Sequence, residues 1–174
     1  MQPIKKYDPV SRTLHWLIVL AILTMIGLGI SFGYTSGKTF STLMFIHKSL
    51  GMTILLLMIL RVIWKFTGMY KPEYSFDMQA ANRFAASSVH ALMYLCLFIM
   101  PLSGWFGSSL AGYPVPFWGL ANLQLPLVIN KPLASIMFDI HSTTIWVLVS
   151  LIVLHILGAI YHERRKERVI RRML

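Results

Sequence analysis

Apolar residues run along this chain in four long, nearly uncharged stretches separated by more polar segments. Each stretch is long enough to cross a bilayer as a helix, which takes about 20 residues. Because a helix satisfies its own backbone hydrogen bonds in lipid, the pattern predicts an all-α membrane protein in which four transmembrane helices form an up-and-down bundle. The predicted spans are residues 13–32, 43–66, 84–110 and 133–161.

The segments between the stretches indicate a single membrane domain over residues 1–174. The first stretch follows basic residues but lacks a small-residue cleavage site, so we interpret it as a retained helix and not a signal peptide. Residues 71–82 are typical of a polar loop. Residues 111–132 hold four prolines, which excludes a fifth span, and we expect them to fold over the outer mouth of the bundle with Tyr and Trp at the membrane interface.

Composition supports a membrane setting, since 56% of the residues are hydrophobic and only 13% are charged. Soluble domains carry about twice that charged fraction. The single cysteine, Cys96, lies within an apolar run, where it cannot form an intrachain disulfide and is expected to be buried.

The net charge of +10 is distributed unevenly across the predicted membrane. One side has only Lys38, Lys48 and Lys131. The excess of Lys and Arg on the other side predicts that both termini are cytoplasmic. This asymmetry accounts for the net charge of the chain, so the charge does not indicate a nucleic-acid partner. The basic tail, residues 162–174, is expected to form a helix along anionic headgroups. The basic residues of that side are Lys5, Lys6, Arg12, Arg61, Lys65, Lys71, Arg83, Arg164, Arg165, Lys166, Arg168, Arg171 and Arg172.

Six histidines fall in or beside the predicted spans, at two depths. A polar ring in lipid is costly unless it has a partner, so such histidines indicate function. His47 and His141 lie toward the outer side, and the inner group comprises His15, His90, His155 and His162. His141 and His155 are fourteen residues apart, which places both on nearly the same helix face about 21 Å apart along the axis. This spacing suggests ligands for two stacked cofactors.

Haem fits this layout better than a bare metal ion. Six-coordinate haem b needs two axial imidazoles from facing helices and otherwise an apolar slot, whereas zinc or copper would need three or four converging ligands. Only six residues of the chain are acidic, and Asp139 is the only one near a histidine of a span. Gly51 and Gly158, each one turn after a histidine, could let a flat porphyrin approach the backbone, and Arg12 could bind a haem propionate.

Six strings in order along the chain carry a family resemblance. They are LHW at His15, IHKSLG at His47, LRVIWK at Arg61, LMYLCLFIMPLSG after His90, DIHST at His141 and LHILGAIYHE at His155. Together they resemble the bacterial cytochrome b561 family of four-helix di-haem membrane proteins, which is related to the haem b subunits of membrane-bound hydrogenases and formate dehydrogenases. The resemblance covers essentially the whole chain.

The resemblance implies two haems b held by four histidines. His47 and His141 would bind the outer haem iron, and His15 and His155 the inner haem iron. Position along the helices alone allows His90 as the inner ligand in place of His15, and the resemblance favours His15. His90 and His162 would then be candidate catalytic groups for quinone binding or proton exchange. The arginine-rich tail departs from the family, so no inherited partner surface is expected there.

The implied function is electron transfer across the inner membrane, with ubiquinone as the expected electron partner. Bis-imidazole ligation leaves no open site on iron, which favours outer-sphere electron transfer. The chain could itself be an enzyme that oxidises superoxide and reduces quinone. Alternatively, it could be the membrane anchor and electron-transfer subunit of a separate dehydrogenase, hydrogenase or soluble periplasmic haem protein. A structural, non-redox bundle is the third alternative.

Overall fold

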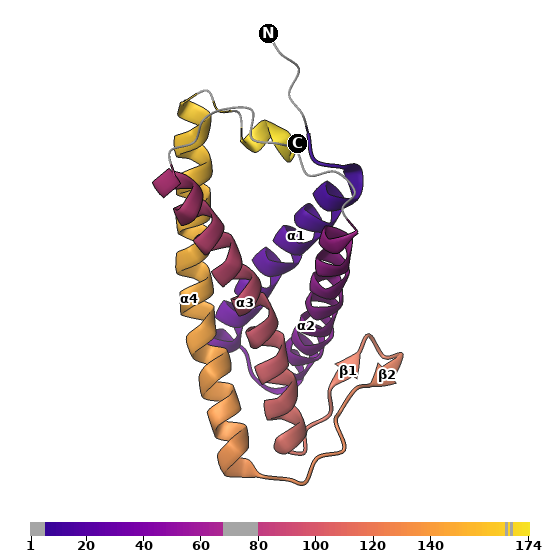
Figure 1. The fold of residues 1–174 in the computed structure, drawn as a ribbon. Helices are drawn as coiled ribbons and strands as arrows, with labels where there is room; N and C mark the ends of the chain where they lie inside the picture. Colours follow the sequence, from indigo (N-terminus) through magenta and orange to yellow (C-terminus); the bar gives the residue numbers. More distant parts are fainter. Residues whose placement is uncertain (1–5, 68–79, 166, 168) are drawn as a thin grey trace.

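A computed structural model gives the fold, and it describes residues 6–67, 80–165, 167 and 169–174. Four long helices make up most of it: α1 (Pro9–Ser31), α2 (Gly37–Phe66), α3 (Ala80–Leu110) and α4 (Lys131–Arg164). All four are long and apolar enough to cross a membrane, which confirms the predicted all-α membrane bundle (Figure 1). The helices overlap the four predicted spans and extend beyond most of their ends. Most of the predicted polar loop, 71–82, lies outside the described residues.

The helices pack as two pairs, α1 with α2 and α3 with α4, and α2 joins the pairs through its contact with α3. Figure 1 shows α1 and α4 diverging toward the end of the bundle that carries both chain termini. We call this the termini end. The opposite end carries the α1–α2 and α3–α4 connections, and we call it the hairpin end.

A compact apolar core lies where the four helices meet. Met58 and Leu148 are almost fully buried, and they cluster with Ile18, Cys96 and Leu151. The burial predicted for Cys96 is confirmed. Away from this core the helices expose many large apolar side chains, as expected of surfaces that face lipid.

Polar caps and prolines fix where two of the helices begin. The side chain of Asp8 accepts a hydrogen bond from the Ser11 N–H at 2.9 Å before α1, and that of Asn130 accepts from the Leu133 N–H at 3.0 Å before α4. A proline follows each cap within the first two helical positions, where its missing N–H costs no helical bond. Inside α3, by contrast, Pro101 removes a bond to the carbonyl four residues earlier.

The basic tail does not continue as the helix we expected. α4 ends at Arg164, and a short 3₁₀ turn, η2 (Ile170–Arg172), follows. The tail folds back to α1, because its last three carbonyls accept hydrogen bonds from the Tyr7 N–H, the Trp16 indole and the Arg12 guanidinium. Arg172 is buried and not presented to headgroups. The apolar periodicity of α4 does not indicate that the helix ends at Arg164 or that the tail folds back to α1.

The α3–α4 connection also differs from the expectation. It forms a small antiparallel hairpin of β1 (Pro116–Phe117) and β2 (Ala121–Asn122), in which Phe117 pairs with Ala121. β1 packs along the flank of α2 and does not cover the mouth of the bundle (Figure 1).

Replacing Asp8 by alanine should destabilise the termini end. The Asp8 carboxylate caps α1 and also accepts a hydrogen bond from the Trp64 indole at 2.9 Å. Losing an N-cap costs about 1–2 kcal/mol, so we expect a lower midpoint of thermal unfolding in detergent micelles. Trp64→Phe, which keeps the cap, should cause a smaller decrease.

The same carboxylate should make this contribution depend on pH. Burial acts to raise the pKa of Asp8, but the hydrogen bonds from Ser11 and Trp64 outweigh it and hold the pKa below its usual 3.8. Because its folded-state pKa is lowered, the Asp8 carboxylate stabilises the folded protein above pH 3.8. This stabilisation is lost as the pH falls through the folded-state pKa. The difference in midpoint between the wild type and Asp8→Ala should therefore shrink below pH 3.8; an unchanged difference would contradict the assignment.

Candidate functional site

Two histidines face each other across the bundle toward the hairpin end. His47 comes from α2 and His141 from α4, and their ring centroids are 6.0 Å apart with an interplanar angle of 69°. Two imidazoles that bind one metal from opposite sides, each about 2 Å from it, place their centroids roughly 6 Å apart. The centroid separation of the pair predicted for the outer layer is close to this value.

His141 is held by the backbone of α3. Its Nδ1 lies 2.7 Å from the carbonyl oxygen of Met100, which accepts only if Nδ1 carries the proton. In a neutral imidazole this bond leaves Nε2 as the nitrogen with a free lone pair. A metal-binding histidine almost always donates its other ring N–H in this way, to a carbonyl or a carboxylate.

Gly104 makes room for the His141 ring against α3. A Cβ atom at this position would lie 3.0 Å from Nδ1 and 3.1 Å from Cε1 of His141. These distances are tighter than ordinary van der Waals contact. The missing side chain thus allows the ring to reach the Met100 carbonyl.

His47 has an unsatisfied nitrogen. Its Nδ1 is buried and has no hydrogen-bond partner among the described residues, a costly state for a polar atom. The ring packs edge-on against Phe32, at 5.3 Å between centroids. A half-buried imidazole whose Nδ1 has no hydrogen-bond partner, close to a second imidazole oriented by α3, fits a bound iron porphyrin.

Gly104→Ala should displace His141 and lower haem content. The added methyl group must push the ring away from Met100, because the clash is with the ring itself. We expect purified protein to lose haem absorbance, measured as the haem-to-protein ratio. Gly29→Ala, on α1, is the matched control, since a Cβ there meets nothing within 4 Å. Equal haem content in the two variants would show that Gly104 does not position His141.

Three histidines gather toward the termini end. The rings of His90 on α3 and His155 on α4 are 5.0 Å apart, and His15 on α1 interacts electrostatically with both. His90 Nδ1 lies 2.7 Å from the Ala86 carbonyl oxygen, so its ring is oriented as that of His141 is. The spacing of 5.0 Å is shorter than the roughly 6 Å expected of two rings on one metal. His15 and His90 thus remain alternative partners for His155.

A partly buried cation accompanies this group. Arg61 on α2 donates to the Tyr94 hydroxyl at 2.8 Å and to the Ser11 carbonyl at 3.2 Å, which ties it to α3 and α1. It also interacts electrostatically with His15. From the sequence, Arg61 was assigned only to the basic side of the membrane and to one string of the family resemblance. One feature of the sequence could have identified Arg61 as a candidate site residue. It lies inside an apolar span, about one and a half turns before the end of α2.

The remaining predicted residues make other contacts. His162 pairs with Glu167 at 2.5 Å between Nδ1 and Oε2. The Arg12 guanidinium donates to the Leu174 carbonyl at 2.6 Å. A Cβ at Gly51 would meet only the end of Met25, at 3.8 Å. Neither glycine proposed for porphyrin approach, Gly51 or Gly158, is crowded.

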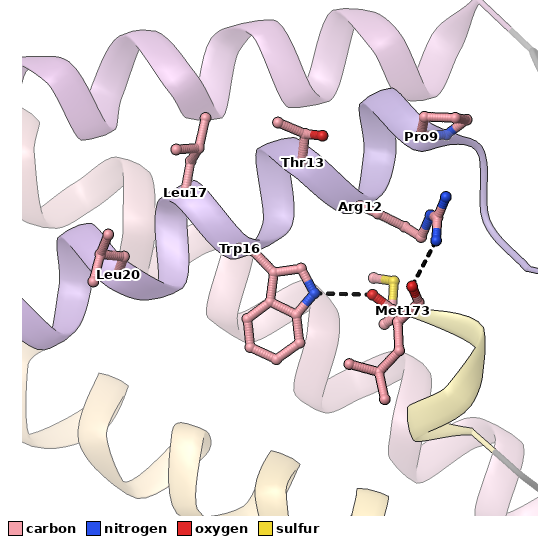
Figure 2. Close-up of a pocket in the computed structure, with 8 residues that line it drawn as sticks. Pro9, Arg12, Thr13, Trp16, Leu17, Leu20 and Met173 are labelled. Carbon is pink, nitrogen blue, oxygen red and sulfur yellow. Dashed lines mark hydrogen bonds between the residues drawn. The ribbon is translucent and has the colours of Figure 1, made fainter.

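A pocket of about 510 Å³ opens between α1 and the tail (Figure 2). Arg12 and Trp16 form its polar rim, and both hydrogen-bond to the tail. Leu17 and Leu20 continue it along α1. His90 and His162 do not line it. Within the described ranges, no group of three or more His, Cys, Asp or Glu side chains could hold a bare metal ion.

Comparison with known proteins agrees with this architecture. Residues 6–174 match the family profile described as prokaryotic cytochrome b561. Cytochrome b561 homolog 2 of Escherichia coli K12 is 27% identical over 177 aligned residues, which cover 98% of this chain and 92% of that protein. The chain therefore belongs to the prokaryotic cytochrome b561 family, whose members are membrane cytochromes that bind haem b and carry electrons.

Proposed function

We propose that the protein carries electrons across a bacterial inner membrane through two haems b, one at each histidine level. His47 and His141 would bind the haem at the hairpin end, and His15 and His155 the haem at the termini end. The 6.0 Å separation of the His47 and His141 rings carries the proposal, together with the bond from His141 to the Met100 carbonyl. Haem b would supply reversible one-electron chemistry at each level.

The side chains around the two levels favour electron transfer over catalysis at iron. Two axial imidazoles per metal would leave no coordination position for a substrate. His141 and His155 lie fourteen residues apart on α4, about 21 Å along its axis. α4 thus connects the two levels.

The distribution of basic residues indicates how the protein is oriented in the membrane. The termini end holds most of the basic residues, so we place both termini in the cytoplasm. Lys48 lies beside His47 on the opposite side, where its ammonium donates to the Pro114 carbonyl at 2.8 Å. This charge would favour an anionic electron donor at the hairpin end.

We place ubiquinone at the termini end. Reduction of a quinone to a quinol takes two electrons and two protons, and imidazole is suited to supplying protons near neutral pH. His90 and His162 are our candidates for this role, and His162 has Glu167 as a partner that could replenish its proton. The pocket between α1 and the tail offers an apolar route from lipid, next to His15 in sequence.

For the donor we propose superoxide, which would be oxidised to dioxygen and give up one electron. The alternative is a separate dehydrogenase, hydrogenase or periplasmic haem protein for which the chain acts as the membrane subunit. The few basic residues of the hairpin end, Lys38, Lys48 and Lys131, favour the small donor, because a soluble redox protein is usually docked through complementary charges.

The experiment is a reduction assay on the purified haem-loaded protein in lipid nanodiscs with ubiquinone. Superoxide should reduce the haems without any added protein, and one quinol should form for every two superoxide ions consumed. Lys48→Gln should slow haem reduction by superoxide, because the positive charge next to His47 is lost. Reduction only after a partner protein is added would favour the alternative.

A further inference from the structure

The connection between α3 and α4 carries no charge. Residues 111–130 include no Asp, Glu, Lys, Arg or His. We call residues 113–129 the hairpin segment; it contains β1 and β2. A water-exposed connection of this length normally has charged residues, because they solvate the loop. Its composition is that of a surface in contact with lipid.

The hairpin segment lies at membrane depth along α2. The Trp118 N–H donates to Ser49 Oγ at 3.0 Å, and the Trp118 indole donates to Thr53 Oγ1 at 2.9 Å. Ser49 and Thr53 are twelve and sixteen residues from the start of α2 at Gly37. They are therefore about 18 Å and 24 Å along its axis.

These distances place the segment inside the hydrocarbon layer. α2 has 30 residues and is about 45 Å long, whereas the hydrocarbon core is about 30 Å thick. If the whole excess of about 15 Å extended from the hairpin end, Ser49 would still lie below the hydrocarbon boundary. Tilting the helix shortens the excess and moves both residues deeper.

Many backbone groups of the segment bond to protein groups, which lowers the cost of placing them in lipid. The Leu120 N–H bonds to the Phe117 carbonyl at 2.9 Å, and the Leu123 N–H to the Val115 carbonyl at 2.8 Å. Side chains form hydrogen bonds with other backbone groups of the segment. Asn122 accepts from the Val115 N–H, and the Trp105 indole donates to the Leu123 carbonyl.

The turn is locked on α2 despite an unfavourable backbone. Trp118 has φ +51° and Gly119 has φ +75°, a pair of left-handed residues that tight hairpins normally build from Asn and Gly. A bulky residue keeps this conformation only where its surroundings fix it. The two bonds from Trp118 to α2 do so, and they leave Leu120 at the tip 82% exposed.

We propose that the hairpin segment inserts into the lipid leaflet at the hairpin end, with Leu120 in contact with acyl chains. The apolar surface that Leu120 presents continues the lipid-facing surface of α2, on which Leu56 and Leu60 are also exposed. The segment thus anchors the hairpin end in lipid. It also holds Lys48, next to His47, through the Pro114 carbonyl.

Cysteine labelling in proteoliposomes tests the insertion. A membrane-impermeant maleimide is applied to Leu120→Cys in a Cys96→Ala background. Lys38→Cys is the water-exposed control and Leu154→Cys, on the lipid-facing side of α4, is the buried-in-lipid control. We expect Leu120→Cys to resist labelling as Leu154→Cys does, and to label fully after denaturation in SDS. Labelling at the rate of Lys38→Cys would overturn the proposal.

A second measurement separates lipid from a second copy of the chain. Phospholipid with a photoreactive acyl chain should cross-link to the peptide that contains Leu120. Haem content of the cysteine variant, measured before labelling, verifies that the protein is folded. A chain-to-chain cross-link at this position without any lipid adduct would contradict insertion.

Discussion

His141→Ala protein should retain only one of the two haems, a loss of half the haem b per chain. The His141 ring is 6.0 Å from that of His47 and is oriented by the Met100 carbonyl, so its removal leaves one ligand on one side of the site. We expect His47→Ala to have the same effect, because both rings would serve the same iron. Pyridine haemochrome absorbance per chain measures the loss.

The control for this experiment is His162→Ala. His162 is paired with Glu167 and is not a ligand in either proposed pair, so its variant should keep both haems. If His141→Ala and His47→Ala bound as much haem as the wild type, the two rings would not be ligands. If the double variant lost more than either single variant, they would not share one iron.

The second large effect concerns the termini end, where His15→Ala should lose the other haem and His90→Ala should retain it. His155 is the expected common partner, and its spacing of 5.0 Å from His90 is short for two rings on one metal. His155→Ala should therefore behave like His15→Ala. Low-spin EPR signals of the remaining haem would show which level has been emptied.

The opposite outcome is just as informative. Loss of haem in His90→Ala with retention in His15→Ala would make His90 the axial ligand. The bond from His90 Nδ1 to the Ala86 carbonyl would then have the orienting role that Met100 has for His141. Neither result would alter the assignment at the hairpin end.

The histidine levels could be predicted because helix geometry is regular. A residue's depth in a membrane helix follows from its distance along the sequence, so His47 and His141 could be placed at one level before any coordinates. The structure adds which rings touch. His90 contacts His155 because α3 packs closely on α4, and packing partners are not encoded in the spacing within one helix.

The parts that could not be predicted depend on contacts between distant segments. Gly104 precedes His141 by 37 residues and matters only because α3 and α4 pack side by side. The folded-back tail and the hairpin segment are held by bonds to α1 and α2, from residues such as Trp16 and Ser49. Local composition identified both segments as non-spanning, but it did not indicate their partners.

Haem stoichiometry of the wild-type protein tests the central claim most directly. Protein purified from cells supplied with haem precursor, quantified by amino-acid analysis and pyridine haemochrome, should contain two haems b per chain. Both should give low-spin EPR signals typical of bis-imidazole iron. One haem per chain, or colourless protein that takes up no haem on reconstitution, would contradict the account.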